Sequence, residues 1–251
     1  MRKNALPSFL GKAIAVGRRP TRPEIGAHQS SAANSHHRQW TFQITGIVFW
    51  RDAPVPWTLG VMDLTIRPLT AGLWPALEDL FGRAGASNGC WCMYWRIGPR
   101  YKDRSREDNK RDLERLATSG PPPGLLAFDG EVPAGWCELA PRTSLAWLAH
   151  ARYLRPVDDL PVWSVPCFYV RRTHRGQGVP DALIEAALAA AASSSAPALE
   201  AYPVDTGVAG HSRNLFPGVA SAFARHGFQV VARHKPDRPI MRKALSRTAA
   251  H

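Results

Sequence analysis

Downstream of Met62, hydrophobic and polar residues recur with the periods of alternating strands and helices. Residues 64–67 alternate with the two-residue period of a strand, and residues 72–81 carry apolar side chains at helical spacing. Residues 106–118 form a charged segment that we predict to be a helix, because a run of glycines and prolines follows it. The first part of this region is therefore predicted to be a strand followed by two helices.

The remainder of this region is predicted to contain more strands. Two apolar runs flank Asp129-Gly130, a dipeptide that supplies the positive φ needed by a tight hairpin turn. The predicted elements are strands over 124–128, 132–138 and 162–170, a helix over 178–192, a strand over 198–202, a helix over 216–226, and a closing hairpin of 228–233 and 239–244. The predicted order is thus β-α-α-β-β-β-α-β-α-β-β, without an internal repeat.

The first 61 residues differ in composition from the rest of the chain. They hold 8 Lys and Arg against 2 Asp and Glu, a net charge of +6, whereas the remaining residues hold 24 and 18, also +6, over more than three times the length. The segment is rich in Arg, Pro, Ser and His, which is not typical of a packed domain. We expect residues 1–61 to be a disordered basic extension or the result of a mis-assigned start, and to be dispensable for folding and activity. Residues 62–244 are expected to form the domain, and residues 245–251 a tail.

Charge and hydropathy limit the kinds of partner that the chain is expected to bind. The net charge of +12 suggests acidic partners, but no predicted helix carries a basic stripe with interleaved aromatic residues, so we expect no nucleic-acid partner. Binding of nucleic acid through the basic N-terminal segment is kept as an alternative. No run reaches the ~18–20 apolar residues of a membrane span, so we expect no membrane partner.

The cysteines give no sign of a metal site. Cys90 and Cys92 are spaced too closely for a zinc knuckle, and no matching Cys or His pair follows them. Cys137 and Cys167 lie in apolar strand patterns and are expected in the core. We therefore expect no metal, and a reduced, cytoplasmic protein.

A basic turn with two glycines follows the predicted strand over 162–170 and leads into an alanine-rich helix. Gly176 and Gly178 leave room for phosphate oxygens beside the backbone, and Arg175 can add charge-assisted hydrogen bonds. The start of the helix offers free backbone N–H groups that can hold an anion. This turn is therefore predicted to bind a pyrophosphate.

Three phosphate-binding motifs compete for this turn. A P-loop requires a lysine after its last glycine, and none follows Gly178. A dinucleotide fingerprint would place Asp181 in its third glycine position, which a pyrophosphate would reject, although Glu200 could act as its ribose-binding acid. The third motif, Arg/Gln-x-x-Gly-x-Gly/Ala, begins five residues after the last valine of a strand. Here it reads Arg175-Gly-Gln-Gly-Val-Pro180 after Val170.

This third motif resembles the acyl-CoA motif of the GNAT superfamily of N-acetyltransferases. The predicted element order from residue 62 to about 244 is similar to that family, as is the closing aromatic-x-x-x-Gly-Phe segment, Phe223–Phe228. The aromatic segment over 90–96 looks like that of one branch whose substrates are uncharacterised. The resemblance implies a layered α+β fold with a mixed, mostly antiparallel sheet and a splayed central strand pair. It also implies acetyl-CoA as co-substrate.

The resemblance further implies direct transfer of an acetyl group to a primary amine of a small molecule or peptide, and it is compatible with a homodimer. Backbone groups at the end of the 162–170 strand would bind pantetheine and polarise the thioester carbonyl, and the turn would hold the pyrophosphate. Pro180 replaces the family's last Gly or Ala and removes one N–H, but it suits the first turn of a helix. The expected cofactor-binding residues are Cys167, Phe168, Tyr169, Val170, Arg175, Gly176, Gln177, Gly178 and Val179.

Two glutamates are candidates for the general base. Glu138 ends a predicted hairpin strand, and Glu200 lies in the strand beside the predicted splay; either could instead be a surface residue. Burial among apolar side chains raises the pKa of a glutamate toward neutrality, which suits a base. Tyr202 is a candidate proton donor to the leaving thiolate, with a partly buried structural role as the alternative. The family's usual tyrosine is Phe223 here, and its usual asparagine is Phe216. These two replacements leave open an alternative, a weak or inactive acyl-CoA-binding module.

Aromatic residues mark a candidate acceptor site. Trp91, Tyr94 and Trp95 fall where the family often binds its acceptor. They could line a pocket for an apolar or a cationic acceptor, the latter through cation–π contacts. Packing of these side chains against the sheet is the competing interpretation.

Overall fold

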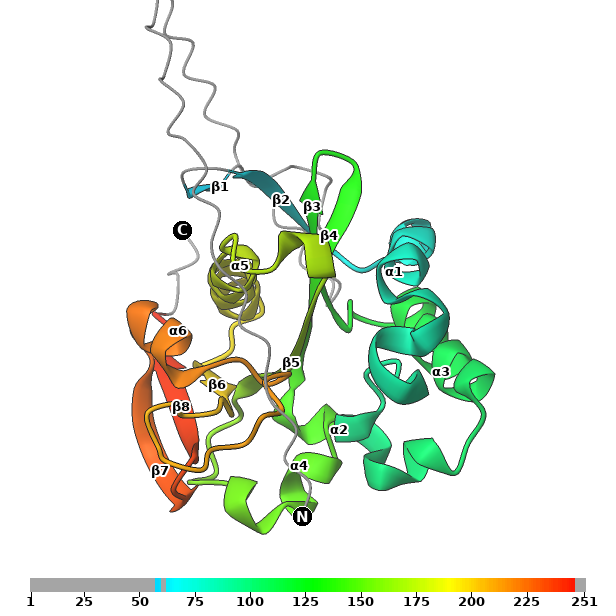
Figure 1. Ribbon diagram of the computed structural model, residues 1–251. Helices are drawn as coiled ribbons and strands as arrows, with labels where there is room; N and C mark the ends of the chain where they lie inside the picture. The colour runs from blue at the N-terminus through cyan, green and yellow to red at the C-terminus, as the bar shows by residue number, and fades with distance from the viewer. Residues whose placement is uncertain (1–56, 60–61, 247–251) are drawn as a thin grey trace, which may run out of the picture. The chain divides into compact units, whose positions relative to one another are not determined.

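The computed structural model describes residues 57–59 and 62–246 (Figure 1). The predicted N-terminal extension lies outside the described residues as far as residue 56, and most of the predicted tail lies outside them after residue 246. Within the predicted extension, Trp57–Leu59 forms strand β1, which pairs with the next strand. The sheet therefore begins five residues before the expected boundary at Met62.

The described residues form a sheet of eight strands in the order β1-β2-β3-β4-β5-β6-β8-β7. Only the β5–β6 pair is parallel. The strands after β1 are β2 (Met62–Pro68), β3 (Gly124–Asp129), β4 (Val132–Pro141), β5 (Trp163–Val170), β6 (Ala198–Ala201), β7 (Gln229–Lys235) and β8 (Arg238–Ala244). The expected α+β class, with a mixed and mostly antiparallel sheet, is confirmed.

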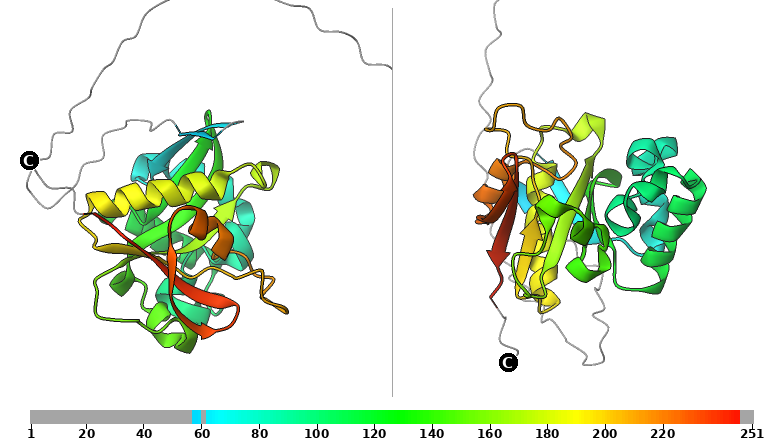
Figure 2. Two further views of the ribbon diagram at one scale, coloured as in Figure 1. Left: turned by 90° about the vertical axis from the view of Figure 1, so that its left-hand side faces the viewer. Right: turned by 90° about the horizontal axis from the view of Figure 1, so that it is seen from below.

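Helices cover both faces of this sheet. Figures 1 and 2 show α1 and α3 on one side and α5 and α6 on the other. The helices are α1 (Trp74–Phe81), α2 (Tyr94–Ile97), α3 (Arg106–Ser119), α4 (Trp147–His150), α5 (Val179–Ser193) and α6 (Ala220–Arg225). None of the helices within residues 57–59 and 62–246 has the length and hydropathy of a membrane span.

Local sequence explains the two longest helices. Ser105 caps α3 by accepting a hydrogen bond from the Asp108 backbone N–H at 3.0 Å. Helix α5 is rich in alanine, and small side chains allow it to lie close to the sheet, where a Cβ at Gly135 of β4 would come within 2.5 Å of the Val179 side chain. The close approach of α5 places the start of this helix directly behind the end of β5.

The helix predicted over 216–226 is shorter in the structure. Helix α6 begins at Ala220, because Gly218 adopts a left-handed φ of +81° and Val219 is extended. The segment before the helix forms a bridge between Val219 and Val204, and the Val204 N–H donates to the Gly218 carbonyl at 2.9 Å. Residues 216–219 therefore form part of a loop that returns from β6 toward β5.

Candidate active site

Strands β5 and β6 separate soon after they begin to pair. Their parallel register contains three pairs and ends at Val165 with Ala201. The next residue, Pro166, lies where the register between β4 and β5 shifts, with one extra residue on β5. Proline has no N–H to donate to a neighbouring strand, and it is tolerated at such a bulge. The edge of β5 from Cys167 to Val170 is thus left without a strand partner on the β6 side, as expected for a splayed pair.

The free edge of β5 exposes backbone groups of alternate residues. The Phe168 N–H donates to the carbonyl of Phe216, in the returning loop, at 2.7 Å, so this N–H points away from β4. The Val170 carbonyl accepts from Arg175 Nε at 3.3 Å. Cys167 and Tyr169 instead face β4 with their backbones, in register with Glu138 and Trp136. Of the four predicted strand residues, Phe168 and Val170 therefore present backbone groups at the splay.

The turn after β5 has the shape of an anion-binding site. Gly176 and Gly178 have left-handed φ values of +75° and +80°, and a Cβ added to either would meet nothing within 4 Å. The backbone N–H groups of Gly176, Gln177 and Gly178 donate no hydrogen bond within the described part of the chain. Helix α5 starts at Val179 with Pro180 in its first turn and no side-chain cap. The free N–H groups and the helix start favour an anion here.

The side chains around this turn do not cover its backbone N–H groups. Gln177 Nε2 donates to the Thr173 carbonyl at 2.7 Å, and Arg175 is exposed. The carboxylate of Asp181, in the first turn of α5, accepts from Arg225 Nη2 at 2.8 Å and lies 3.1 Å from His226 Nε2. The Asp181 carboxylate therefore contacts Arg225, in α6, and His226, which follows α6.

Glu138 is a fully buried carboxylate with unused hydrogen-bonding capacity. Its Oε1 lies 3.1 Å from Arg96 Nε, an ion pair without hydrogen-bond geometry, and its Oε2 has no hydrogen-bond partner within the described residues. Burial raises the pKa of Glu138 to about 7, although the Arg96 charge partly lowers it. Its register partner on β5 is Cys167, the first residue beyond Pro166. A proton acceptor of suitable pKa is thus placed beside the start of the splay.

Glu200 lies in a dense network of ion pairs. Its Oε1 accepts from Arg242 at 2.9 and 2.6 Å, and its Oε2 accepts from Arg142 at 3.2 Å and from the Tyr202 hydroxyl at 3.0 Å. The Tyr202 hydroxyl also lies 2.8 Å from Ser164 Oγ. Burial, together with the Glu200 charge, raises the pKa of Tyr202. Both Glu200 oxygens are occupied, so this side chain is not free to bind a ribose, as the dinucleotide alternative requires.

Replacing Glu200 with glutamine should destabilise the fold. The Arg142 and Arg242 side chains are each 12% exposed, and the substitution would remove a charge that both of them contact. We expect the free energy of unfolding to fall by about 3 kcal/mol, measured by chemical denaturation. The matched control, Glu185→Gln, changes a partly exposed glutamate and should cost no more than about 0.5 kcal/mol. Equal effects of the two substitutions would show that the network does not contribute to stability.

The three predicted acceptor residues are not gathered around one cavity of the described structure. Trp91 is 5% exposed and packs on Trp74 and Phe81, with ring centroids 5.9 and 5.4 Å apart. Trp95 is also buried and contacts Tyr94, with ring centroids 4.8 Å apart. Tyr94 alone is partly exposed. Packing in the core thus explains the positions of the two tryptophans without an acceptor site.

Arg96 is a site residue that sequence reasoning missed. It contacts Glu138 and also lines a pocket of about 230 Å³. The other lining residues are mostly apolar: Leu116, Ser119, Gly120, Pro121, Pro122, Pro123, Leu139, Ala140, Pro141, Ser144 and Trp163. No local pattern identifies this arginine, because its partner lies on a strand far along the sequence.

Comparison with known proteins gives a family match. The family described as the acetyltransferase (GNAT) family matches residues 89–213, which include Glu138, the turn after β5 and Glu200. No curated protein shows significant similarity to this chain.

Three solved structures to which this chain is similar have low sequence identity. A GNAT family acetyltransferase from Listeria monocytogenes is 15% identical with a TM-score of 0.47, covering 76% of this chain and 100% of that one. YncA, a putative acetyltransferase from Salmonella typhimurium with acetyl-CoA, is 17% identical with a TM-score of 0.44, covering 74% and 96%. The PaiA N-acetyltransferase from Thermoplasma acidophilum, in complex with coenzyme A, is 15% identical with a TM-score of 0.43, covering 73% and 99%. Identities this low say nothing about the acceptor substrate.

Proposed function

This chain belongs to the acetyltransferase (GNAT) family, and from that premise we propose that it is an acetyl-CoA-dependent N-acetyltransferase acting on a primary amine of a small molecule or peptide. The observation that carries the proposal is the open turn at Gly176–Gly178, with its unused N–H groups, directly after a strand whose edge is free. Acetyl-CoA supplies an activated thioester, and the amine nitrogen bonds to its carbonyl carbon as the carbon–sulfur bond breaks.

The proposed cofactor contacts divide between the turn and the strand edge. The N–H groups of Gly176, Gln177 and Gly178, with the Arg175 side chain, would hold the pyrophosphate. The Val170 carbonyl would accept a hydrogen bond from an amide of the pantetheine arm, and the Phe168 N–H would donate to the thioester carbonyl and polarise it. The Phe216 carbonyl now accepts from the Phe168 N–H, so this loop residue must move aside for the cofactor.

Glu138 is the general base in this proposal. A carboxyl with a pKa of about 7 is partly ionised at neutral pH and can take a proton from the amine as it attacks. Glu200 and Tyr202 are assigned a structural role, because each is buried in the network that joins Arg142 to Arg242. We further propose that the acceptor reaches Glu138 from the pocket that Arg96 lines.

A second candidate function is an acyl-CoA-binding module with little or no turnover. It is favoured by Phe223, which is fully buried and packs on Phe168 with ring centroids 5.9 Å apart. Phe223 has no hydroxyl with which to protonate a leaving thiolate. Departure of the thiolate without a proton donor is feasible, because a free thiol has a pKa of roughly 8.5. We therefore retain acetyl transfer as the proposed function.

Two measurements test and then separate the two candidates. Acetyl-CoA titrated into the full chain by calorimetry should bind at one saturable site, with NAD and ATP as negative controls. Thiol release with a panel of amines then distinguishes the enzyme from the module, since only the enzyme releases CoA in the presence of an acceptor. Absence of acetyl-CoA binding would refute both.

The chemistry of the cysteines supports a cytoplasmic setting for this proposal. All four cysteines are free, and Cys92 and Cys137 are buried. Unpaired thiols are typical of a reducing compartment.

A further inference from the structure

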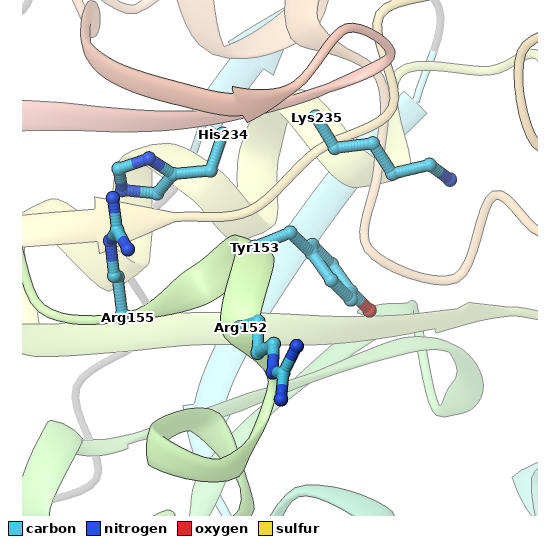
Figure 3. A pocket seen from close by; sticks show the side chains of 5 residues that line it. All are labelled: Arg152, Tyr153, Arg155, His234 and Lys235. Atoms are coloured by element: carbon cyan, nitrogen blue, oxygen red, sulfur yellow. The ribbon is translucent and has the colours of Figure 1, made fainter.

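A basic pocket is lined by residues to which the proposed acetyl transfer has so far assigned no role. Its volume is about 410 Å³, and it is lined by Arg152, Tyr153, Arg155, His234 and Lys235 (Figure 3). The first two lining residues belong to the short helical turn η6 (Arg152–Leu154), and the last two end β7. We refer to it as the β7 pocket. It shares no lining residue with the turn after β5 or with the pocket that Arg96 lines.

Cationic side chains line the β7 pocket without an acidic residue of the described chain among them. The side chains of Arg152, Arg155 and His234 are exposed and form no ion pair or hydrogen bond with other described residues. Like charges around one hollow repel each other and create a positive potential that attracts an anion.

Three acidic residues near these elements are already paired, and Asp159, four residues after Arg155, is exposed and forms no ion pair with Arg152 or Arg155. Asp237 lies 3.1 Å from Lys235 Nζ and also accepts from the Ser212 N–H at 3.0 Å. The other pairs are Asp158 with Arg242, at 2.6 and 2.9 Å, and Asp205 with Arg233, at 2.9 Å. These acidic residues therefore do not neutralise the charges of Arg152 and Arg155.

A fixed aromatic side chain stands between the cations. The Tyr153 ring lies 5.5 Å from the Arg238 guanidinium carbon and 6.0 Å from Lys235 Nζ. Arg238 is 7% exposed, and its Nη2 donates to the Tyr202 carbonyl at 3.1 Å. This buried guanidinium holds the ring through a cation–π contact and adds to the positive potential.

We propose that the β7 pocket is a second anion-binding site, which takes the phosphate group of a phosphorylated small molecule. Two guanidinium groups can donate several hydrogen bonds to the oxygens of a phosphate, in the geometry that arginine favours. The volume exceeds that of the phosphate alone and lies in the range of small-molecule sites. The phosphate belongs either to the acceptor amine or to a separate effector.

Inorganic phosphate is the probe that tests this site. Titrated by calorimetry into the full chain at constant ionic strength, it should bind saturably, and about tenfold or more weakly in Arg152→Ala/Arg155→Ala. The control Arg83→Ala/Arg100→Ala removes the same charge from two other exposed arginines and should leave binding unchanged. Absence of saturable binding, or equal weakening in both double variants, would overturn the proposal.

The turn after β5 could also bind phosphate, so a third variant separates the two sites. Gly178→Asp places a negative charge at that turn and should leave phosphate binding at the β7 pocket unchanged. Loss of phosphate binding in Gly178→Asp, with retention in Arg152→Ala/Arg155→Ala, would move the site to the turn and refute the proposal. Because the readout is phosphate binding, this result does not depend on acetyl transfer.

Inhibition kinetics identify the source of the phosphate. If the acceptor carries it, inorganic phosphate competes with the amine; if an effector carries it, phosphate leaves the KM for the amine unchanged. A phosphate effect that persists in Arg152→Ala/Arg155→Ala would count against the β7 pocket.

Discussion

Gly178→Asp should abolish binding of acetyl-CoA, whereas Gly178→Asn should retain most of it. Gly178 has a φ of +80°, a conformation that Asp and Asn both tolerate better than other side chains, and no protein atom lies within 4 Å of the added Cβ. The two side chains are almost equal in size, so the pair differs mainly in charge. A carboxylate there would repel the pyrophosphate that the turn is proposed to hold.

We expect the Kd for acetyl-CoA to rise by at least about 100-fold in Gly178→Asp and by no more than about tenfold in Gly178→Asn. Calorimetry gives both values, and thermal unfolding shows whether each variant is folded. Similar affinities in the two folded variants would place the pyrophosphate elsewhere.

Glu138→Gln should remove most of the transferase activity while leaving acetyl-CoA binding unchanged. Glutamine keeps the shape of the side chain but cannot accept the proton of the amine, and loss of a general base typically costs about 10²–10⁴ in rate. The measurement is kcat/KM for an amine acceptor, together with the Kd for acetyl-CoA. An unchanged kcat/KM would exclude Glu138 as the base.

The pH profile provides an independent check on Glu138. Because the carboxylate is the active form, kcat/KM of the natural protein should rise with pH through about 7 and then level off. The Gln variant should lack this rise.

Stability should respond to pH in the opposite direction to activity. Folding raises the pKa of Glu138 from 4.5 to about 7, so the folded state holds its proton where the unfolded state has lost it. This group therefore makes the free energy of unfolding fall as pH rises from about 4.5 to about 7. Glu138→Gln should lack this fall and stay folded at pH 8, so its loss of activity could not be attributed to unfolding.

Local sequence was sufficient for the parts of the site that are continuous in the chain. The apolar run of β5, the two glycines of the turn and the alanine-rich α5 are adjacent, and each has its own local signal. The family resemblance rested on these residues together with the element order, the closing Phe223–Phe228 segment and the aromatic segment over 90–96.

Long-range pairs could not be predicted in this way. The pairing of Glu138 with Arg96, and the contacts of Glu200 with Arg142 and Arg242, join elements far apart in the sequence. Such contacts depend on strand order and register rather than on periodicity. The sequence alone therefore could not distinguish the carboxylate of Glu138, which has an oxygen without a partner in the described chain, from that of Glu200, whose two oxygens are both occupied. Trp91 shows the same limit, since its burial depends on a left-handed φ of +44° that no local pattern of aromatic residues indicates.

The short β5–β6 ladder also has a consequence for how the two parts of the sheet move. Only three residue pairs connect β2–β5 with β6–β8–β7 through backbone pairing, and the pairing stops at Pro166. A pantetheine arm lying along the free edge of β5 would supply hydrogen-bond partners that β6 does not provide there. Binding of the cofactor would then slow amide hydrogen exchange more in β6 and β8 than in β2 and β3, because β6 and β8 lie beyond the short ladder. The ligand would thus strengthen the connection between the two parts of the sheet.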